Sequence, residues 1–140
     1  MFERVKTLEG TWEMVDEKGE RHVAATFTVS SNGTIVREVM FPGGAHEMTN
    51  IYHMDGPTLL LTHYCAMGNQ PRMRARELRA DQIAFAHDSV TNLDSPETAY
   101  MGEMTLVFTG PDTVLQEWRS IANGTRDASH DVSIRLTRRR

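Results

Sequence analysis

Short runs of alternating apolar and polar residues dominate the chain, and turn residues separate the runs at close intervals. The runs are rich in Val, Ile, Thr, Tyr and Phe, and a period of two is typical of strands with one buried face. Glycine, proline and asparagine between the runs supply the backbone conformations that tight turns need. The pattern predicts about ten β-strands, at residues 10–16, 21–30, 34–41, 46–54, 58–65, 72–79, 82–88, 100–109, 113–122 and 130–138.

Two segments depart from the strand pattern. The first, residues 2–8, carries three apolar side chains at helical spacing: Phe2, Val5 and Leu8. We expect a short helix that lays these side chains against one end of the sheet. The second, residues 89–99, is too long for a tight hairpin, and Ser95 followed by Pro96 indicates an N-cap and a helical turn. Either segment is suited to cover one end of a barrel.

Consecutive hairpins without a long crossover predict an up-and-down meander, and such a sheet closes on itself to avoid two exposed edges. We therefore expect an all-β fold: a closed up-and-down antiparallel barrel of about ten strands with a short N-terminal helix. A barrel of this size is wider than one that its own side chains fill, so an internal cavity is expected.

Composition and charge fit one globular domain over residues 1–140, with 39% hydrophobic and 24% charged residues. The net charge of −4 leaves no basic excess for a phosphate backbone, which disfavours nucleic-acid binding. Cys65 is the only cysteine, and the longest aliphatic run, Leu59–Leu61, is far too short to span a bilayer. Glu3 and Lys6 stand where a signal peptide has its apolar region, so we expect a cytoplasmic protein.

The start of the first predicted strand, Gly10-Thr11-Trp12 after a short helix, resembles the G-x-W opening of the calycin superfamily. That superfamily includes lipocalins, fatty-acid-binding proteins and nitrobindin-like barrels. The resemblance implies that Trp12 closes one barrel end and packs against a basic side chain of the last strand. Arg135 and Arg138 are the candidates for this partner. Structural roles are therefore expected for Gly10, Trp12 and Arg135.

The whole chain also resembles small bacterial lipocalin-like proteins of unknown function. The stretches that carry this resemblance are Leu-Thr-His-Tyr-Cys at residues 61–65 and Gly-Asn-Gln-Pro-Arg at residues 68–72. Nitrobindin-like proteins hold haem through a histidine near the C-terminus, and His130 is the only histidine so placed here. A haem-binding barrel is therefore an alternative, and no cofactor is assigned.

Two short turns give a register for the strands between residues 34 and 65. If Gly43-Gly44 is a two-residue hairpin loop, Val39 sits opposite Met48. If Asp55-Gly56 is the next such loop, Met48 in turn sits opposite His63. One face of the sheet then comprises Ile35, Arg37, Val39, Phe41, His46, Met48, Asn50, Tyr52, Leu59, Leu61, His63 and Cys65.

This face holds large apolar groups and no carboxylate, whereas the opposite face carries Glu38 and Glu47. Burying an unpaired carboxylate is costly, so we expect the first face to line the cavity and both glutamates to lie outside it. The predicted ligand-binding residues are Arg37, His46, Met48, Asn50, Tyr52 and His63.

Polar groups that converge in an apolar cavity are typical of a small-molecule site. An inward Arg37 would receive a ligand carboxylate, as in the fatty-acid-binding branch of the calycins. The favoured function is therefore non-catalytic binding of a small, mostly apolar or amphiphilic molecule, with a carboxylate as one candidate head group.

Other interpretations stay open. His46 and His63 also fit hydrogen-bonded core histidines, and a metal site with Cys65 would have no carboxylate ligand on this face. The sequence shows no nucleophile elbow, phosphate loop, Rossmann glycine pattern, zincin helix or C-x-x-C pair. An enzyme with a cavity histidine as general base, a barrel that binds proteins through its outer face, and a homodimer remain alternatives.

Overall fold

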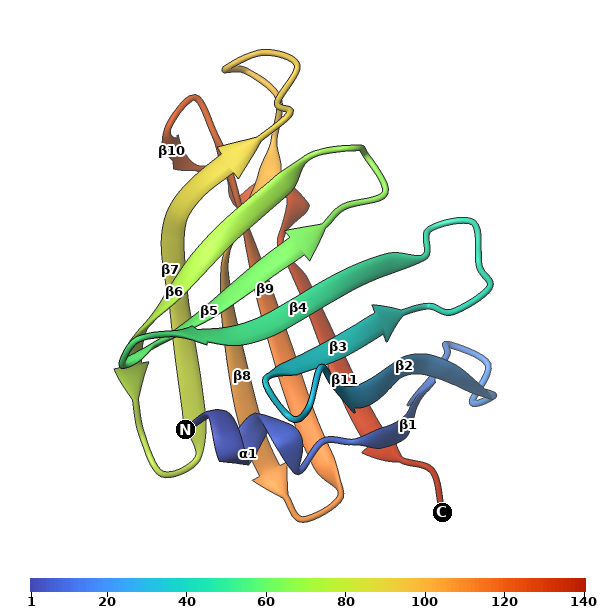
Figure 1. Cartoon of the computed structure of the whole chain (residues 1–140). Coiled ribbons are helices and arrows are strands. Elements are labelled where there is room, and N and C mark those ends of the chain that lie inside the picture. The colour runs from blue at the N-terminus through green and yellow to red at the C-terminus, as the bar shows by residue number, and fades with distance from the viewer.

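Each long strand pairs antiparallel with its neighbours in the chain, and the last long strand returns beside the first (Figure 1). The computed structural model describes residues 1–140. The barrel strands are β1 (Gly10–Val15), β2 (Arg21–Ser30), β3 (Ile35–Met40), β4 (Met48–Asp55), β5 (Thr58–Tyr64), β6 (Gln70–Leu78), β7 (Gln82–Thr91), β8 (Tyr100–Gly110), β9 (Thr113–Ala122) and β11 (Val132–Arg138). Because β9 pairs with both β8 and β11, and β11 pairs with β1, the sheet closes. The expected closed up-and-down antiparallel barrel of ten strands is confirmed.

Three small elements sit at the two ends of the barrel. Helix α1 (Phe2–Lys6) lies across the lower end in Figure 1, as the sequence predicted. Strand β10 (Thr125–Arg126) pairs with the end of β9, and the 3₁₀ turn η1 (Ala128–His130) leads into β11. Both lie at the upper end, near the loop of residues 92–99. No helix in the chain has the length and apolar character needed to cross a membrane.

The loop before β8 begins later than expected but contains the turn that was expected at Ser95. Strand β7 continues to Thr91 instead of ending at residue 88, and a single turn follows at residues 95–98. The amide of Thr98 donates to the carbonyl of Ser95 at 3.1 Å, and this single bond is not continued. The N-cap signal at Ser95 therefore produced one turn, because the chain enters β8 two residues later.

The G-x-W segment closes the α1 end of the barrel. Trp12 is 1% exposed, and its indole nitrogen donates to the carbonyl of Leu8 at 2.7 Å. The basic partner of Trp12 is Arg138, whose guanidinium carbon lies 4.4 Å from the centre of the indole ring. The assignment of this role to Arg135 is wrong, because Arg135 points outward between the buried Ile134 and Leu136.

Arg138 also holds the chain around this end. Its guanidinium donates to the carbonyls of Thr7 and Glu9 at 2.7 and 2.8 Å. Gly10 has a φ of +133°, and a Cβ atom there would stand 3.2 Å from Nη1 of Arg138. Gly10 therefore leaves room for the guanidinium, which is a structural role as predicted.

The register between β3 and β4 differs by one residue from the prediction. Met40, instead of Val39, is the partner of Met48. The reason is that residues 41–47 form a longer loop in place of a two-residue turn, with Phe41 in the left-handed region at a φ of 50°. The amide of Gly44 donates to the carbonyl of Phe41 at 3.0 Å, which places the tight turn at the beginning of this loop.

This shift turns β3 over relative to the prediction. Val36, Glu38 and Met40 are buried in the barrel, whereas Arg37 is exposed. The expectations of an inward Arg37 and an outward Glu38 are therefore both wrong. Glu47 is exposed, as expected, and accepts a hydrogen bond from the amide of Gly43 at 2.6 Å.

The register between β4 and β5 differs by two residues, which leaves the faces unchanged. The hairpin loop is Gly56-Pro57, so Asp55 pairs with Thr58 and Asn50 pairs with His63. Asn50 and His63 are both buried inside the barrel. The inward orientation predicted for them is correct, although His63 does not face Met48.

A cluster of 20 buried apolar residues, with at least one from every barrel strand, forms the core. Met73 on β6 is fully buried, while its neighbours Arg72 and Arg74 point outward. Arg74 forms an ion pair with Asp88 at 2.6 Å on that outer face. The core thus occupies the interior and leaves the β6 arginines on the outside, as their alternation indicates.

Candidate functional site

A cavity of about 650 Å³ opens at the barrel end opposite α1. Its walls come from the loops after β3 and β5, the start of β8, the end of β9 and the segment that enters β11. The lining residues are His46, Cys65, Met67, Ala99, Tyr100, Met101, Ser120, Ser129, His130, Asp131 and Val132. The volume falls within the range of small-molecule pockets, roughly 300–1,000 Å³.

Exposed apolar side chains stand at the mouth of this cavity. Met67 is 71% exposed and Val132 is 43% exposed, although both are large apolar residues. No arginine or lysine lines the cavity, and Asp131 is its only carboxylate. The site therefore offers apolar contact surface, and the imidazoles of His46 and His130 are the only basic side chains in its lining.

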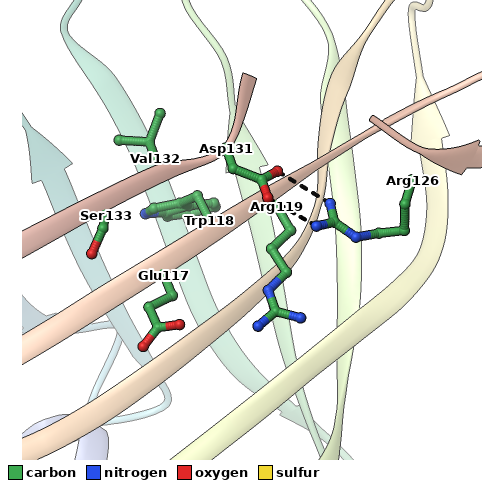
Figure 2. A pocket seen from close by; sticks show the side chains of 7 residues that line it. All are labelled: Glu117, Trp118, Arg119, Arg126, Asp131, Val132 and Ser133. Atoms are coloured by element: carbon green, nitrogen blue, oxygen red, sulfur yellow. Dashed lines mark hydrogen bonds and ion pairs between the residues drawn. The ribbon is translucent and has the colours of Figure 1, made fainter. Parts of the chain in front are cut away.

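An ion pair holds the rim where η1 enters β11. Figure 2 shows the Arg126 guanidinium directed at the carboxylate of Asp131. The two groups are 2.8 Å apart, and both residues line a second, more open pocket beside β9. Asp131 also accepts from the backbone amide of Ser120 at 3.0 Å. These hydrogen bonds lower the pKa of Asp131 to about 2, and the bond from Arg126 has the largest effect. The Asp131 carboxylate is thus ionised, and its oxygens are occupied by hydrogen bonds within the rim.

Three polar residues lie side by side on neighbouring strands inside the barrel. Glu38, Asn50 and His63 are successive cross-strand partners on β3, β4 and β5. The Asn50 amide nitrogen donates to Oε2 of Glu38 at 2.8 Å. Oδ1 of Asn50 lies 2.7 Å from Nδ1 of His63. All three residues are at most 2% exposed.

Further donors converge on Glu38 from other strands. The hydroxyl of Tyr52 donates to Oε2 at 2.8 Å, and the amide nitrogen of Gln116 on β9 donates to Oε1 at 2.7 Å. The indole nitrogen of Trp118 in turn donates to Oε1 of Gln116 at 3.1 Å. The Trp118 ring also packs against His63, with 4.8 Å between ring centres. The network therefore joins both walls of the barrel through one carboxyl group.

Burial controls the protonation of this network. Desolvation raises the pKa of Glu38, while the hydrogen bonds from Gln116, Asn50 and Tyr52 oppose that rise. Desolvation also raises the pKa of Tyr52, and the neighbouring charge of Glu38 adds to the effect. For His63, burial lowers the pKa to about 4. His63 is therefore a neutral imidazole at neutral pH.

The network lies directly beneath the cavity. Inward positions alternate along a strand, so His63 lies one inward position deeper than Cys65, which lines the cavity. Trp118 likewise lies one inward position deeper than Ser120, another lining residue. The ring pair of His63 and Trp118 therefore belongs to the layer of side chains just below the lining residues, which we call the floor of the cavity.

The predicted binding residues fall into three groups. Asn50, Tyr52 and His63 belong to the buried network, and Met48 packs at the edge of the core. His46 lies in the exposed loop of residues 41–47 and reaches only the rim of the cavity, so its predicted inward strand position is wrong. Arg37 is on the outer surface and takes no part. The structure brings the first three together: Asn50 and Tyr52 donate to Glu38, and His63 joins them through its hydrogen bond with Asn50.

Sequence reasoning missed Glu38, Gln116 and Tyr100. Glu38 was placed outside because an unpaired buried carboxylate is costly, but three donors pair it here. One signal was available: Gln116 lies between Val114 and Trp118 on the same face of a predicted strand, which marks a polar group on an otherwise apolar face. That signal does not reveal which residue Gln116 contacts.

Potential metal ligands gather at a different place, the turn between β1 and β2. Asp16, Glu20 and His22 lie close together there. Asp16 already accepts from the amides of Lys18 and Glu20 at 2.8 and 2.9 Å, and from His22 at 2.6 Å, as expected for a closed turn. The alternative set of His46, His63 and Cys65 does not form such a cluster.

No protein-family model and no curated protein matches the chain. The fold and the cavity therefore define its class: a closed ten-stranded antiparallel β-barrel with an apolar cavity open at one end.

Proposed function

We propose that this protein is a calycin-like barrel that binds a small, mostly apolar molecule without transforming it. The observation that carries the proposal is the cavity of about 650 Å³, with apolar residues at its mouth and a polar network at its floor. Apolar walls with a few placed polar groups are the usual composition of small-molecule sites. The calycin assignment is supported by the contact between Trp12 and Arg138.

The ligand proposed here differs from the sequence expectation in one respect. A carboxylate head group needs a cation, and Arg37 lies outside the barrel. The lining residues include no arginine or lysine that replaces it. We therefore propose an apolar ligand without a requirement for a carboxylate.

Catalysis by a cavity histidine is less well supported. A general base works best when its pKa lies near the operating pH, whereas burial holds the pKa of His63 at about 4. His46 is in an exposed loop at the rim of the cavity. Binding thus fits the geometry better than proton transfer.

Haem binding is a second candidate, favoured by one observation. His130 lines the cavity, and its Nδ1 lies 3.2 Å from Oδ2 of Asp127, so its Nε2 would be the atom that holds the haem iron. Titration with haemin tests this candidate: a Soret shift that is lost in His130→Ala would support it. An unchanged spectrum would leave apolar binding as the function.

Native mass spectrometry of the protein purified from cells tests the main proposal, because a retained ligand reveals its mass. Displacement of an environment-sensitive apolar dye gives the affinity for added compounds. Binding of no apolar compound in either assay would overturn the proposal. A cytoplasmic location belongs to the same proposal, since the free thiol of Cys65 suits a reducing compartment.

A further inference from the structure

We infer that the molecule bound in the cavity carries a neutral hydrogen-bond donor, a hydroxyl or an amide N–H, and that Nε2 of His63 accepts it. This inference rests on the proposed binding function and specifies the chemistry of the ligand. It follows from the direction of each hydrogen bond in the buried network and from the position of the ring.

The network determines which nitrogen of His63 carries the proton. Glu38 accepts hydrogens from Asn50, Tyr52 and Gln116, so the amide nitrogen of Asn50 is directed at Glu38. Oδ1 of Asn50 is then left to face Nδ1 of His63, and an oxygen acceptor requires an N–H there. The neutral imidazole therefore carries its proton on Nδ1 and a lone pair on Nε2.

Nε2 is free to meet a ligand. It has no hydrogen-bond partner in the chain, since Nδ1 makes the only side-chain bond of His63. Two side-chain polar atoms in the protein are fully enclosed and lack a hydrogen-bond partner, namely Asn69 Oδ1 and His87 Nδ1. Nε2 of His63 also lacks a partner but is not fully enclosed, so it retains some accessible surface. The ring lies one inward position below Cys65, which lines the cavity. A ligand that reaches the floor therefore meets an acceptor.

The same geometry disfavours a carboxylate. A carboxylate oxygen would face the lone pair of Nε2, and the Glu38 carboxyl group lies beyond Asn50. Protonation of His63 would be needed to reverse this, and burial holds its pKa at about 4. No arginine or lysine lines the cavity to compensate.

An ammonium group is disfavoured for a different reason. It would lose its hydration, and the two nearby carboxylates already have partners: Asp131 pairs with Arg126, and Glu38 receives three hydrogen bonds. A neutral hydroxyl or amide loses less hydration on burial than either ion and still donates to Nε2. Neutral donors are therefore the class that this floor selects.

Four probes of equal chain length separate these chemistries: 1-decanol, 1-methoxydecane, decanoate and decylammonium. Affinities are measured at neutral pH by dye displacement. Decanol is expected to bind about three- to tenfold more tightly than its methyl ether, because only the alcohol donates a hydrogen bond. His63→Phe should remove this preference while retaining the affinity for the ether, and His53→Phe, on the outer face of β4, serves as the matched control that retains it.

The outcomes distinguish the inference from the function on which it rests. Binding of the probes with equal affinity for alcohol and ether, or with decanoate or decylammonium bound most tightly, overturns the inference and leaves apolar binding intact. Failure of all four probes to bind overturns both. If His63→Phe does not fold, ¹⁵N spectra of the wild-type imidazole decide: the inference requires that decanol, and not the ether, shifts Nε2, and an unshifted Nε2 overturns it.

Discussion

Glu38 on β3 and Gln116 on β9 are 78 residues apart in the chain, yet a hydrogen bond of 2.7 Å joins their side chains inside the barrel. Their strands are not neighbours in the sheet, so the bond crosses the interior. Both side chains have no exposed surface. This contact converts an isolated buried carboxyl group into the centre of a network that holds His63 in one orientation.

Removal of the Glu38 carboxyl group is expected to destabilise the barrel strongly. Glu38→Ala leaves the donors of Asn50, Tyr52 and Gln116 without an acceptor, and each buried unpaired donor costs about 1–3 kcal/mol. We expect a loss of about 3–5 kcal/mol in the free energy of unfolding, measured by urea denaturation. Arg37→Ala, at the exposed neighbouring position, should change it by less than about 0.5 kcal/mol. Equal effects of the two substitutions would contradict the network.

His63 should make the stability depend on pH. Its pKa is lowered from 6.5 to about 4 in the folded state, so the unfolded chain binds more protons between these values. The contribution of the neutral His63 to the free energy of unfolding is fully present above pH 6.5 and is lost as the pH falls toward about 4. Glu38, with its raised pKa, acts in the opposite direction, since its ionisation destabilises the folded state as the pH rises.

The difference between wild type and His63→Phe isolates this contribution. Unfolding measured from pH 7 to pH 4 should show the wild type losing about 3 kcal/mol more than the variant. His53→Phe should decline with the wild type. Parallel curves for wild type and His63→Phe would show that the buried imidazole is not held neutral.

The contact between Trp12 and Arg138 predicts which C-terminal arginine matters. Trp12→Ala should cost about 3–5 kcal/mol, as for other buried aromatic residues. Arg138→Ala should cost about 2 kcal/mol, since it removes the contact with the ring and the bonds to the carbonyls of Thr7 and Glu9. Arg135→Ala, on the outer face of the same strand, should have little effect in the same denaturation assay. The reverse order for the two arginines would reject this closure of the barrel.

Two exposed methionines give a matched test of the cavity mouth. Met67 lines the mouth, whereas Met54 is exposed at the end of β4 and is not part of the cavity. Met67→Asp should weaken the binding of an apolar dye about tenfold or more, because it places a charge in the apolar entrance. Met54→Asp should leave the dye affinity unchanged. Neither side chain belongs to the apolar core, so thermal unfolding should show both variants folded.

The strands and the short helix were predictable because their signals are local. The alternation and the turn residues predicted most strand boundaries to within a few residues of those observed. The spacing of Val5 and Leu8 identified the side chains of the N-terminal segment that are buried against the barrel. The candidate site was predictable only in part. Asn50 and His63 were predicted correctly, because an error of two residues in the pairing of β4 with β5 leaves each side chain on the same face of the sheet. The error of one residue in the pairing of β3 with β4 placed Arg37 inside and Glu38 outside, which is the reverse of the structure.

The sequence by itself determined the closed antiparallel barrel, since the period of its apolar residues and its turn residues act within a few positions of one another. The tertiary structure alone decided which face of β3 is buried. That choice depends on the left-handed Phe41 and the loop of residues 41–47, and on Gln116, which supplies the acceptor Glu38 with a donor from the far side of the barrel. A buried carboxyl group is tolerated only when such partners reach it, and contacts across 78 residues arise only after the barrel closes.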